Sequence, residues 1–449
     1  MLNKFKSIIR LVKSLDVDKV NALAKKIDFN EALSALDKLD DNQLKQMMKM
    51  LKGGDGNNEL PWIDGDFYNL HSTLPLEDRK IQMQVRDFMH QEVAPIINDY
   101  WRRDEFPKEL IPKLADLNIC GLTYKGYGCP GKSFLLEGFV AMEMAKTDTS
   151  ISTFFGVQSG LCMGSIYLLG SEEQKEYWLP KLQKFEKIGA FGLTEPEVGS
   201  AVAGGLTTTV KKEGDSWVLN GQKKWIGNAT FSDIVIIYAR DLDDGQVKGF
   251  IVETDTPGFK AEKIKDKMAL RVVQNATITM ENCKVPDSSK LEKANSFKDL
   301  ASVLRMTRAS VAWQAVGCAR GAYEYAVQYT HDRKQFGKSI SSFQLIQDHL
   351  VTMLSNLTAM QNMCYRLSQM QDNGELKDEH ASLAKVFCTL RTRDIVSTAR
   401  EVMGGNGILL EYNVARFVAD AEAIYSYEGT KEINSLIVGR AITGKSAFI

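Results

Sequence analysis

The order in which helical and strand patterns follow one another constrains the fold of this chain most. From Pro61 to about Ala190, apolar residues recur mostly at helical spacing. Alternating and β-branched runs then fill roughly 100 residues, and the helical period returns from about Phe297. Because strands and helices are segregated along the chain, a doubly wound parallel sheet is disfavoured and an α+β fold is expected.

The boundaries of these elements can be predicted from the same patterns. The expected helices before the sheet are 77–100, 108–117, 135–146 and 152–170, followed by a helix capped by Ser171. The expected strands are 206–210, 217–225, 234–240, 249–253 and 276–285. We therefore predict four parts: an N-terminal helical extension and linker (1–60), an α-helical domain (61–189), a β domain (190–295) and a C-terminal α-helical domain (296–449).

The N-terminal extension alternates apolar residues at helical spacing with basic residues, and a linker at 53–58 follows it. Such a helix in residues 1–30 could contact an anionic membrane or a partner protein. A solvated face on a local helix hairpin is the alternative that we favour, because Asp16, Asp18 and Asp28 interrupt the basic pattern.

Composition narrows the classes of function. The formal net charge of −1 gives no global field that would attract nucleic acid. Seven scattered cysteines without a CxxC pair favour reduced thiols, and five histidines without metal spacing make a metal site unexpected. We expect no membrane-spanning helix, secretory signal or Ser-Lys-Leu peroxisomal address, and hence a cytoplasmic protein.

One short stretch suggests chemistry. Glu428 lies between Tyr427 and Gly429, just before a segment with helical spacing. Gly429 allows a sharp backbone bend, and the apolar neighbours Ile424 and Tyr425 would disfavour the ionised carboxylate. That raises its pKa toward the range of a general base. On this stretch alone, an ordinary exposed glutamate in a turn is the alternative.

Several motifs occur together in a characteristic order. They are Phe191–Ser200 (FGLTEPEVGS), Lys223–Asn228 (KKWIGN), Arg333–Lys338 (RKQFGK) with Gln344, Arg400–Gly407 (REVMGGNG) and Tyr427–Thr430 (YEGT). Over about residues 65–449 the chain resembles the acyl-CoA dehydrogenase family in these motifs. The resemblance implies an N-terminal helical domain, a middle β domain and a C-terminal four-helix bundle, with FAD as cofactor.

The resemblance also implies which residues hold the flavin. Backbone groups and the hydroxyl at Leu193–Thr194 would bond the flavin ring, and Trp225 would pack against it, although plain sheet core is an alternative for this tryptophan. The family commonly has threonine or serine where Gly227 stands, and aspartate where Ala201 stands. The implied flavin-binding residues are Phe191, Leu193, Thr194, Gly199, Trp225, Ile226, Gly227, Arg333, Phe336, Gln344, Glu401, Gly404, Gly405 and Thr430.

In the family, the two motifs around Arg333 and Gly404–Gly405 come from a neighbouring subunit. There Arg333 would pair with the pyrophosphate, and the glycines would let backbone N–H groups approach it. The resemblance therefore implies at least a dimer, and members of the family usually form homotetramers.

The implied reaction is α,β-dehydrogenation of an acyl-CoA, a step of fatty acid metabolism. Glu428 would remove the α-proton while the β-carbon gives hydride to flavin N5. Some members carry the base just before the arginine matched by Arg308, but Thr307 occupies that position here. Ser200, Arg308 and Gly429 are the implied substrate-binding residues.

The branch of the family is suggested by finer likenesses. Lys125–Cys129 and Gly439–Gly444 resemble glutaryl-CoA dehydrogenase, but Ser152 and Ala145 replace the arginine and glutamate of its carboxylate pocket. A buried unpaired dicarboxylate tail would cost several kcal/mol. Other segments resemble the plant short-chain acyl-CoA oxidase. We therefore expect a short, uncharged acyl chain, with electron-transferring flavoprotein as acceptor or dioxygen if the enzyme is an oxidase. A nucleic-acid-binding protein on the same scaffold is the rival from another class.

Overall fold

The computed structural model describes residues 64–446, so the predicted N-terminal extension and linker lie outside the described residues. The first described part is helical, as expected. Its helices are α5 (Leu76–Phe88), α6 (Ile97–Arg103), α7 (Leu110–Asp116), α8 (Phe134–Thr147), α9 (Thr149–Gly156), α10 (Met163–Leu169) and α11 (Glu172–Gln183). The glycine-rich loop near Tyr127 forms a hairpin of β1 (Lys125–Gly126) and β2 (Cys129–Pro130).

Two of the predicted helices are interrupted. Within the predicted helix 77–100, α5 ends in a π-helical turn, Met89–Val93. The helix resumes as α6 after Pro95, which has no N–H to donate. The predicted helix 152–170 contains a second π-helical segment, Val157–Cys162, between α9 and α10. There the Gln158 side chain bonds the backbone of Leu182, Lys187 and Gly189. Contacts with the neighbouring chain segments therefore override the regular helical period.

The helix after Ser171 begins as the sequence predicts. The Ser171 hydroxyl accepts a hydrogen bond from the Gln174 N–H, and the Gln174 side chain accepts one from the Ser171 N–H. This reciprocal capping box satisfies two N–H groups at the start of α11.

The middle of the chain forms one mixed seven-stranded sheet. Its strands are β3 (Gly189–Gly192), β4 (Thr209–Glu213), β5 (Ser216–Ile226), β6 (Ile234–Asp241), β7 (Val247–Glu253), β8 (Phe259–Lys263) and β9 (Ala276–Pro286). The order is β3-β6-β4-β5-β9-β8, with β7 paired to β6, and β3 and β4 run parallel to β6. Sequence reasoning missed β3 and β8, and it placed β4 three residues too early. A short helix, α12 (Val202–Gly205), precedes β4.

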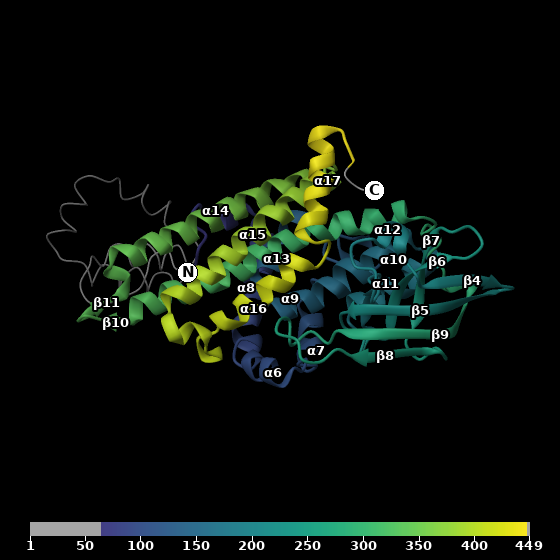
Figure 1. Ribbon diagram of the computed structural model, residues 1–449, viewed down its shortest axis with the longest axis horizontal. Coiled ribbons are helices and arrows are strands. Elements are labelled where there is room, and N and C mark those ends of the chain that lie inside the picture. Colours follow the sequence, from purple (N-terminus) through teal and green to yellow (C-terminus); the bar gives the residue numbers. More distant parts are fainter. Residues whose placement is uncertain (1–63, 447–449) are drawn as a thin grey trace, which may run out of the picture. The chain divides into compact units, whose positions relative to one another are not determined.

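The C-terminal part is a bundle of long helices. They are α13 (Phe297–Asp332), α14 (Gln344–Asp372), α15 (Asp378–Val402), α16 (Val414–Ser426) and α17 (Lys431–Thr443), with the small hairpin β10 (Lys334–Gln335) and β11 (Lys338–Ser339) before α14. Helices α13, α14, α15 and α16 lie side by side, and β7 lies near one end of α13 (Figure 1). The predicted fold, with two helical parts around a β domain, is confirmed.

Helix α13 also packs closely against α8 of the N-terminal part. A Cβ atom at Gly317 would lie 2.4 Å from the carbonyl oxygen of Met142, and one at Gly138 would lie 2.2 Å from the Trp313 indole nitrogen. Glycine is therefore required on both helices for their approach.

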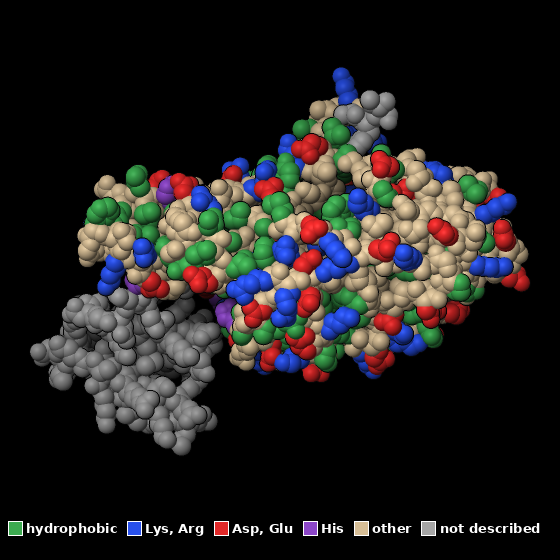
Figure 2. Space-filling view, turned by 60° about the horizontal axis from the view of Figure 1, so that its bottom comes forward, with side chains coloured by type: hydrophobic (Ala, Val, Ile, Leu, Met, Phe, Trp, Pro, Cys, Tyr) green, Lys and Arg blue, Asp and Glu red, His purple; other side chains and the backbone are tan. Residues whose placement is uncertain are grey.

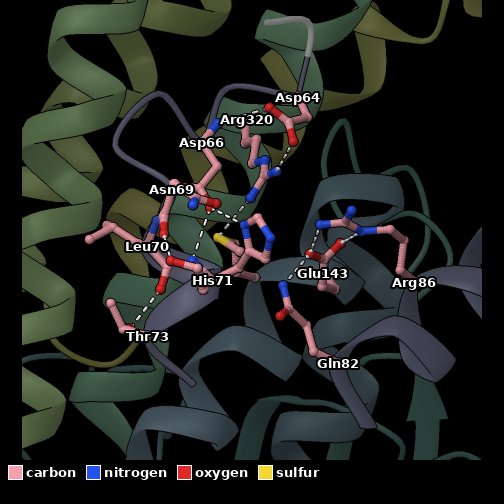
Figure 3. Close-up of polar contacts among 12 residues, drawn as sticks. Asp64, Asp66, Asn69, Leu70, His71, Thr73, Gln82, Arg86, Glu143 and Arg320 are labelled. Atoms are coloured by element: carbon pink, nitrogen blue, oxygen red, sulfur yellow. Dashed lines mark hydrogen bonds and ion pairs between the residues drawn. The ribbon is translucent and has the colours of Figure 1, made fainter. Parts of the chain in front are cut away.

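A buried polar cluster fixes the first helices against α13. Glu143 of α8 accepts hydrogen bonds from Arg86 Nη2 at 2.6 Å and from Gln82 at 2.9 Å. Nearby, Arg320 of α13 faces Asp64, and His71 contacts Asp66 at 2.7 Å (Figure 3). Because Glu143 is fully buried, the positive charges of Arg86 and Arg320 are needed to compensate its charge.

One helical run, Thr149–Leu169, is long and apolar enough to cross a membrane by length and composition. The sequence expectation did not single it out. Most of this run is buried inside the protein, as in a core helix. On the face shown in Figure 2, lysine and arginine side chains are interspersed with aspartate and glutamate.

Candidate active site

A cavity of about 80 Å³ lies between the two helical parts of the chain. Helix α8 contributes Glu137 and Ala141 to its wall, and α13 contributes Thr307 and Gln314. The π-helical segment after α9 supplies more of the wall, which explains why that helix departs from regular spacing here. Glu428 completes the wall, so the predicted base borders an enclosed space.

The turn between α16 and α17 sets the direction of the Glu428 side chain. Glu428 itself has a φ of 55° and Gly429 a φ of 85°. A left-handed conformation is unfavourable for a glutamate, and such strain persists only where surrounding contacts hold it. The Asn434 amide does so by donating a 2.8 Å hydrogen bond to the Gly429 carbonyl, while Thr430 caps α17.

The surroundings of Glu428 act on its pKa in opposite directions. Burial raises the pKa of this carboxyl above its ordinary value, as the sequence predicts. Arg308, the hydrogen bond from Thr307 and Lys385 each lower it, and burial has the larger effect. The Thr307 hydroxyl lies 3.2 Å from Glu428 Oε2. A raised pKa makes the carboxylate a better proton acceptor, which is what a general base requires.

Sequence reasoning missed Lys385 of α15. Its ammonium group is fully buried and donates hydrogen bonds to the carbonyl oxygens of Tyr425, at 3.1 Å, and Gly429. Burial lowers the pKa of this lysine to about 8, with Glu428 acting in the opposite direction. The available signal was a lysine on the apolar face of α15, beside Ala381, Ala384 and Cys388. Lys385 thus positions the turn that carries Glu428.

Arg308 follows Thr307 in α13, so the helix places both residues near the turn of Glu428. Its Nε atom is buried and makes no hydrogen bond within residues 64–446. A buried guanidinium N–H without a partner usually indicates a missing acceptor. This agrees with the predicted role of Arg308 toward a ligand.

The first two flavin motifs meet at the edge of the sheet. The Thr194 carbonyl accepts a 2.8 Å hydrogen bond from the Lys224 N–H, and the Leu193 carbonyl accepts a 3.1 Å bond from Lys223 Nζ. Lys223 also pairs with Glu195 at 2.9 Å, both side chains being buried. Burial raises the pKa of Glu195, whereas the charge of Lys223 lowers it. With the hydrogen bonds to Thr208, Lys223 and Thr207, the net result is a pKa of about 2. This buried ion pair holds the segment that follows β3 against β5.

Trp225 lies at the end of β5 with a φ of 66° and an exposed fraction of 55%. The alternative of plain sheet core is therefore wrong for this tryptophan, whereas Ile226 is buried. A Cβ atom at Gly227 would make ordinary contacts of 3.5 Å with Val157 and Val273. The position thus has room for a small side chain. Phe191 of β3 packs on Tyr238, and Gly199 and Ser200 are exposed after it.

A second, more open cavity of about 280 Å³ brings together Arg333, Gly404 and Gly405, as the sequence predicts. Gly404 has a φ of 58°, and open space surrounds the Cβ position of both glycines. An arginine beside glycine N–H groups suits a phosphate. Three further predicted residues are exposed nearby in the chain: Phe336, with an exposed fraction of 91%, Gln344 and Glu401.

The structure does not bring these two groups of flavin residues together within one chain. Gly227 lies beside Val157, which lines the same cavity as Thr307, whereas Arg333 directly follows the last residue of α13. At 1.5 Å per residue, the part of α13 between Thr307 and Arg333 spans about 39 Å. One FAD cannot contact both ends, so a second subunit is required if both groups hold it.

Comparisons with known proteins agree with these observations. The acyl-CoA dehydrogenase family matches through its N-terminal domain at residues 75–186, its middle domain at 190–283 and its C-terminal domain at 297–443. The 3-(aryl)acrylate reductase of Clostridium sporogenes is 34% identical over 363 residues, covering 80% of this chain and 96% of that protein. The short-chain specific acyl-CoA dehydrogenase of Megasphaera elsdenii is 34% identical over 366 residues, covering 80% and 96%.

Among solved structures, glutaryl-CoA dehydrogenase from Mycobacterium smegmatis is similar with a TM-score of 0.83 and 37% identity, covering 86% of this chain and 99% of that one. The structure of a glutaryl-CoA dehydrogenase from the same organism, 34% identical to this chain with a TM-score of 0.83, is in complex with FADH2. With the same three domains, the same motif order and similarity over most of its length, this chain belongs to the acyl-CoA dehydrogenase family of FAD-dependent oxidoreductases.

Proposed function

We propose that this enzyme dehydrogenates a short, uncharged acyl-CoA thioester to the trans-2-enoyl-CoA, with Glu428 as the base. The observation that carries the proposal is the Glu428 carboxylate, which lines an enclosed cavity and whose pKa burial raises. A thioester whose α-carbon faced this carboxylate would have its α-proton within reach.

The residues around Glu428 either hold its turn in place or stabilise its ionised form. Lys385 and Asn434 hold the turn through the Gly429 carbonyl, so the carboxylate keeps its direction. Thr307 bonds the ionised form, and the neighbouring cation of Arg308 stabilises it as well. A bound acyl chain that displaces water from the cavity would strengthen these interactions. When bound, FAD supplies the acceptor for the hydride that leaves the β-carbon.

The residues present fit FAD. Arg333, Gly404 and Gly405 form a cationic, N–H-lined cavity that suits a pyrophosphate. At the other end of α13, Trp225 offers an exposed aromatic face next to the Leu193–Thr194 segment. An exposed tryptophan beside a rigid backbone segment is a natural surface for a planar ring system.

The wall of the cavity argues against a dicarboxylate substrate. Its lining residues within the described chain include no lysine or arginine. Ser152 stands at the position matched to the carboxylate-binding arginine of glutaryl-CoA dehydrogenase, and it bonds the Ala141 carbonyl at 3.3 Å. A second carboxylate would be buried without a cation and beside Glu137, which disfavours it strongly. We therefore infer that the similarity to glutaryl-CoA dehydrogenase extends to the fold but not to the acyl group of the substrate.

We propose electron-transferring flavoprotein as the electron acceptor and dioxygen as the alternative. Gly227 supports the alternative, because no side-chain hydroxyl is available at the position where the family commonly has one. The separation of the two flavin-binding groups along α13 supports an oligomer, which we propose to be a homotetramer in the cytoplasm. The interspersed charges of Figure 2 do not favour the nucleic-acid-binding rival.

The test is the visible spectrum of the purified flavoprotein under nitrogen, titrated with butyryl-CoA and then opened to air. Bleaching of the flavin supports dehydrogenation, and its persistence or rapid recovery in air separates the two acceptors. The Glu428→Gln variant should retain flavin but bleach at least about 100-fold more slowly. Unchanged bleaching in that variant, or none in the wild type with butyryl-CoA and its longer relatives, would refute the proposal.

A further inference from the structure

The acyl cavity contains a carboxylic acid that the proposed reaction does not use. Glu137 stands in the first turn of α8 and lines the same cavity as Glu428. Its carboxyl group makes no hydrogen bond or ion pair within residues 64–446, although protein surrounds it. Burial, followed by the charge of Asp372, raises its pKa to about 7. Glu137 is half-buried at the cavity wall, and an unpaired carboxyl group that lines a cavity is available to a ligand.

A second polar side chain in the cavity is also free to bond a ligand. Ser310 of α13 lines the wall and makes no hydrogen bond within the described part of the chain. The other polar groups there have partners: Thr153 bonds the Thr149 carbonyl, and Gln314 bonds both Tyr427 and the Ser152 carbonyl. Glu137 and Ser310 are therefore the polar lining side chains that remain available.

The position of Ser310 indicates which part of a substrate it would meet. Ser310 lies one turn beyond Thr307, whose hydroxyl bonds Glu428. One such step along a helix advances about 4.5 Å. An acyl chain whose α-carbon lies at Glu428 would span that distance with about three to four further carbons. Helix α8 reaches α13 in the same region, since Gly138, next to Glu137, touches Trp313.

We propose that the preferred substrate is an ω-hydroxyacyl-CoA of four to six carbons, whose terminal hydroxyl is held by Glu137 and Ser310. This inference rests on the proposed function and specifies its substrate. A hydroxyl donates one hydrogen bond and accepts another, so it can donate to Glu137 and accept from Ser310. An alkyl end would leave both side chains unpaired.

The experiment offers the enzyme ω-hydroxylated acyl-CoAs (4-hydroxybutyryl-, 5-hydroxyvaleryl- and 6-hydroxyhexanoyl-CoA) and alkyl acyl-CoAs of equal size, and compares their specificity constants. In the wild type, at least one hydroxylated chain should be preferred by about tenfold or more. Glu137→Leu and Ser310→Ala should each reduce that preference by at least about threefold. Calorimetric binding of the matching ω-hydroxy-2-enoyl-CoA gives a readout that does not depend on turnover.

The control is Glu176→Gln, which changes an exposed glutamate on α11 and should leave the preference unchanged. Should Glu137→Leu fail to fold, Ser310→Ala and Glu137→Met decide the matter, since neither new side chain offers an oxygen to the hydroxyl. Oxidation of alkyl chains with no preference for a hydroxyl, or a preference that survives both substitutions, overturns this inference and leaves the proposed function intact. Failure of every acyl-CoA to bleach the flavin overturns both.

Discussion

Thr307 of α13 donates a 3.2 Å hydrogen bond to the carboxylate of Glu428 on the turn before α17. The two residues belong to distant parts of the C-terminal domain, yet they meet at the wall of one cavity. The bond favours the ionised carboxylate, whereas burial disfavours it. The protonation of Glu428 therefore depends on a side chain that takes no proton itself.

This relationship predicts the pH dependence of catalysis. Replacing Thr307 by valine removes the donor, so the pKa of Glu428 should rise further. Because the base must be ionised, the acidic limb of the kcat/KM profile should move to higher pH, with less change on the alkaline side. Profiles between pH 5 and pH 9 check this, with Thr443→Val on exposed α17 as control. Coincident acidic limbs would contradict the assignment.

The buried pair of Lys223 and Glu195 predicts a large effect on stability. Lys223→Met leaves the Glu195 carboxylate buried without its cation, which should lower the free energy of unfolding by about 3–5 kcal/mol. The double variant with Glu195→Gln should recover part of that loss. Urea denaturation and the flavin content of each variant measure both effects. Equal stability of the single and double variants would show that the pair does not act as a unit.

The space beside Gly227 predicts that a serine can be introduced there without loss of folding. Its Cβ would lie 3.5 Å from Val157 and Val273, which is ordinary contact. If the missing hydroxyl permits reaction with dioxygen, Gly227→Ser should slow the reoxidation of bleached enzyme in air. Stopped-flow spectra of wild type and variant make the comparison. Identical reoxidation rates would remove Gly227 as the cause of any oxidase activity.

Glu137 predicts a dependence of stability on pH. Its folded pKa of about 7 lies above the ordinary value of 4.5, so the folded state binds its proton more tightly. The resulting stabilisation is fully present below pH 4.5 and is lost as the pH rises through about 7. Relative to the wild type, Glu137→Gln should therefore gain stability between pH 5 and pH 8, by up to about 3 kcal/mol. Thermal denaturation at these two pH values tests the sign, with Glu176→Gln as control.

The distance along α13 predicts complementation between subunits. Arg333→Ala and Glu428→Gln chains should each be inactive, since one lacks the flavin phosphate contact and the other the base. In mixed oligomers, about a quarter of the sites should combine intact residues from two chains. Activity recovered after co-refolding, measured against each variant refolded alone, tests this. No recovery in confirmed mixed oligomers would place the whole FAD site in one chain.

Much of this architecture could be predicted because its signals are local. The capping box at Ser171, the strand β6 and the long C-terminal helices follow directly from residue pattern. The short strand β3, with two glycines among four residues, gives no such signal and forms because β6 pairs with it. The π-helical segment at Val157–Cys162 likewise depends on contacts of Gln158 with distant backbone.

The candidate site divides in the same way. Motif likeness was sufficient to single out Glu428 and the Arg333–Gly404 pair, which line two cavities, and Arg308, whose charge acts on Glu428. Lys385 and Glu137 escaped notice because their significance lies in burial, and an isolated charged residue in a helix pattern usually faces water. The separation of the two flavin groups also required the continuous helix α13 to be seen.

The turn that carries Glu428 follows every other part of the cavity wall in the chain. During synthesis, α8, α9, the sheet and α13 therefore leave the ribosome before the catalytic carboxylate exists. A chain interrupted between the end of α13 and Tyr427 would possess most of the cavity wall but not the carboxylate that we propose takes the α-proton. Incomplete translation products would thus be chemically inert, and the cell would be exposed to acyl-CoA oxidation only by chains whose other parts had already been made.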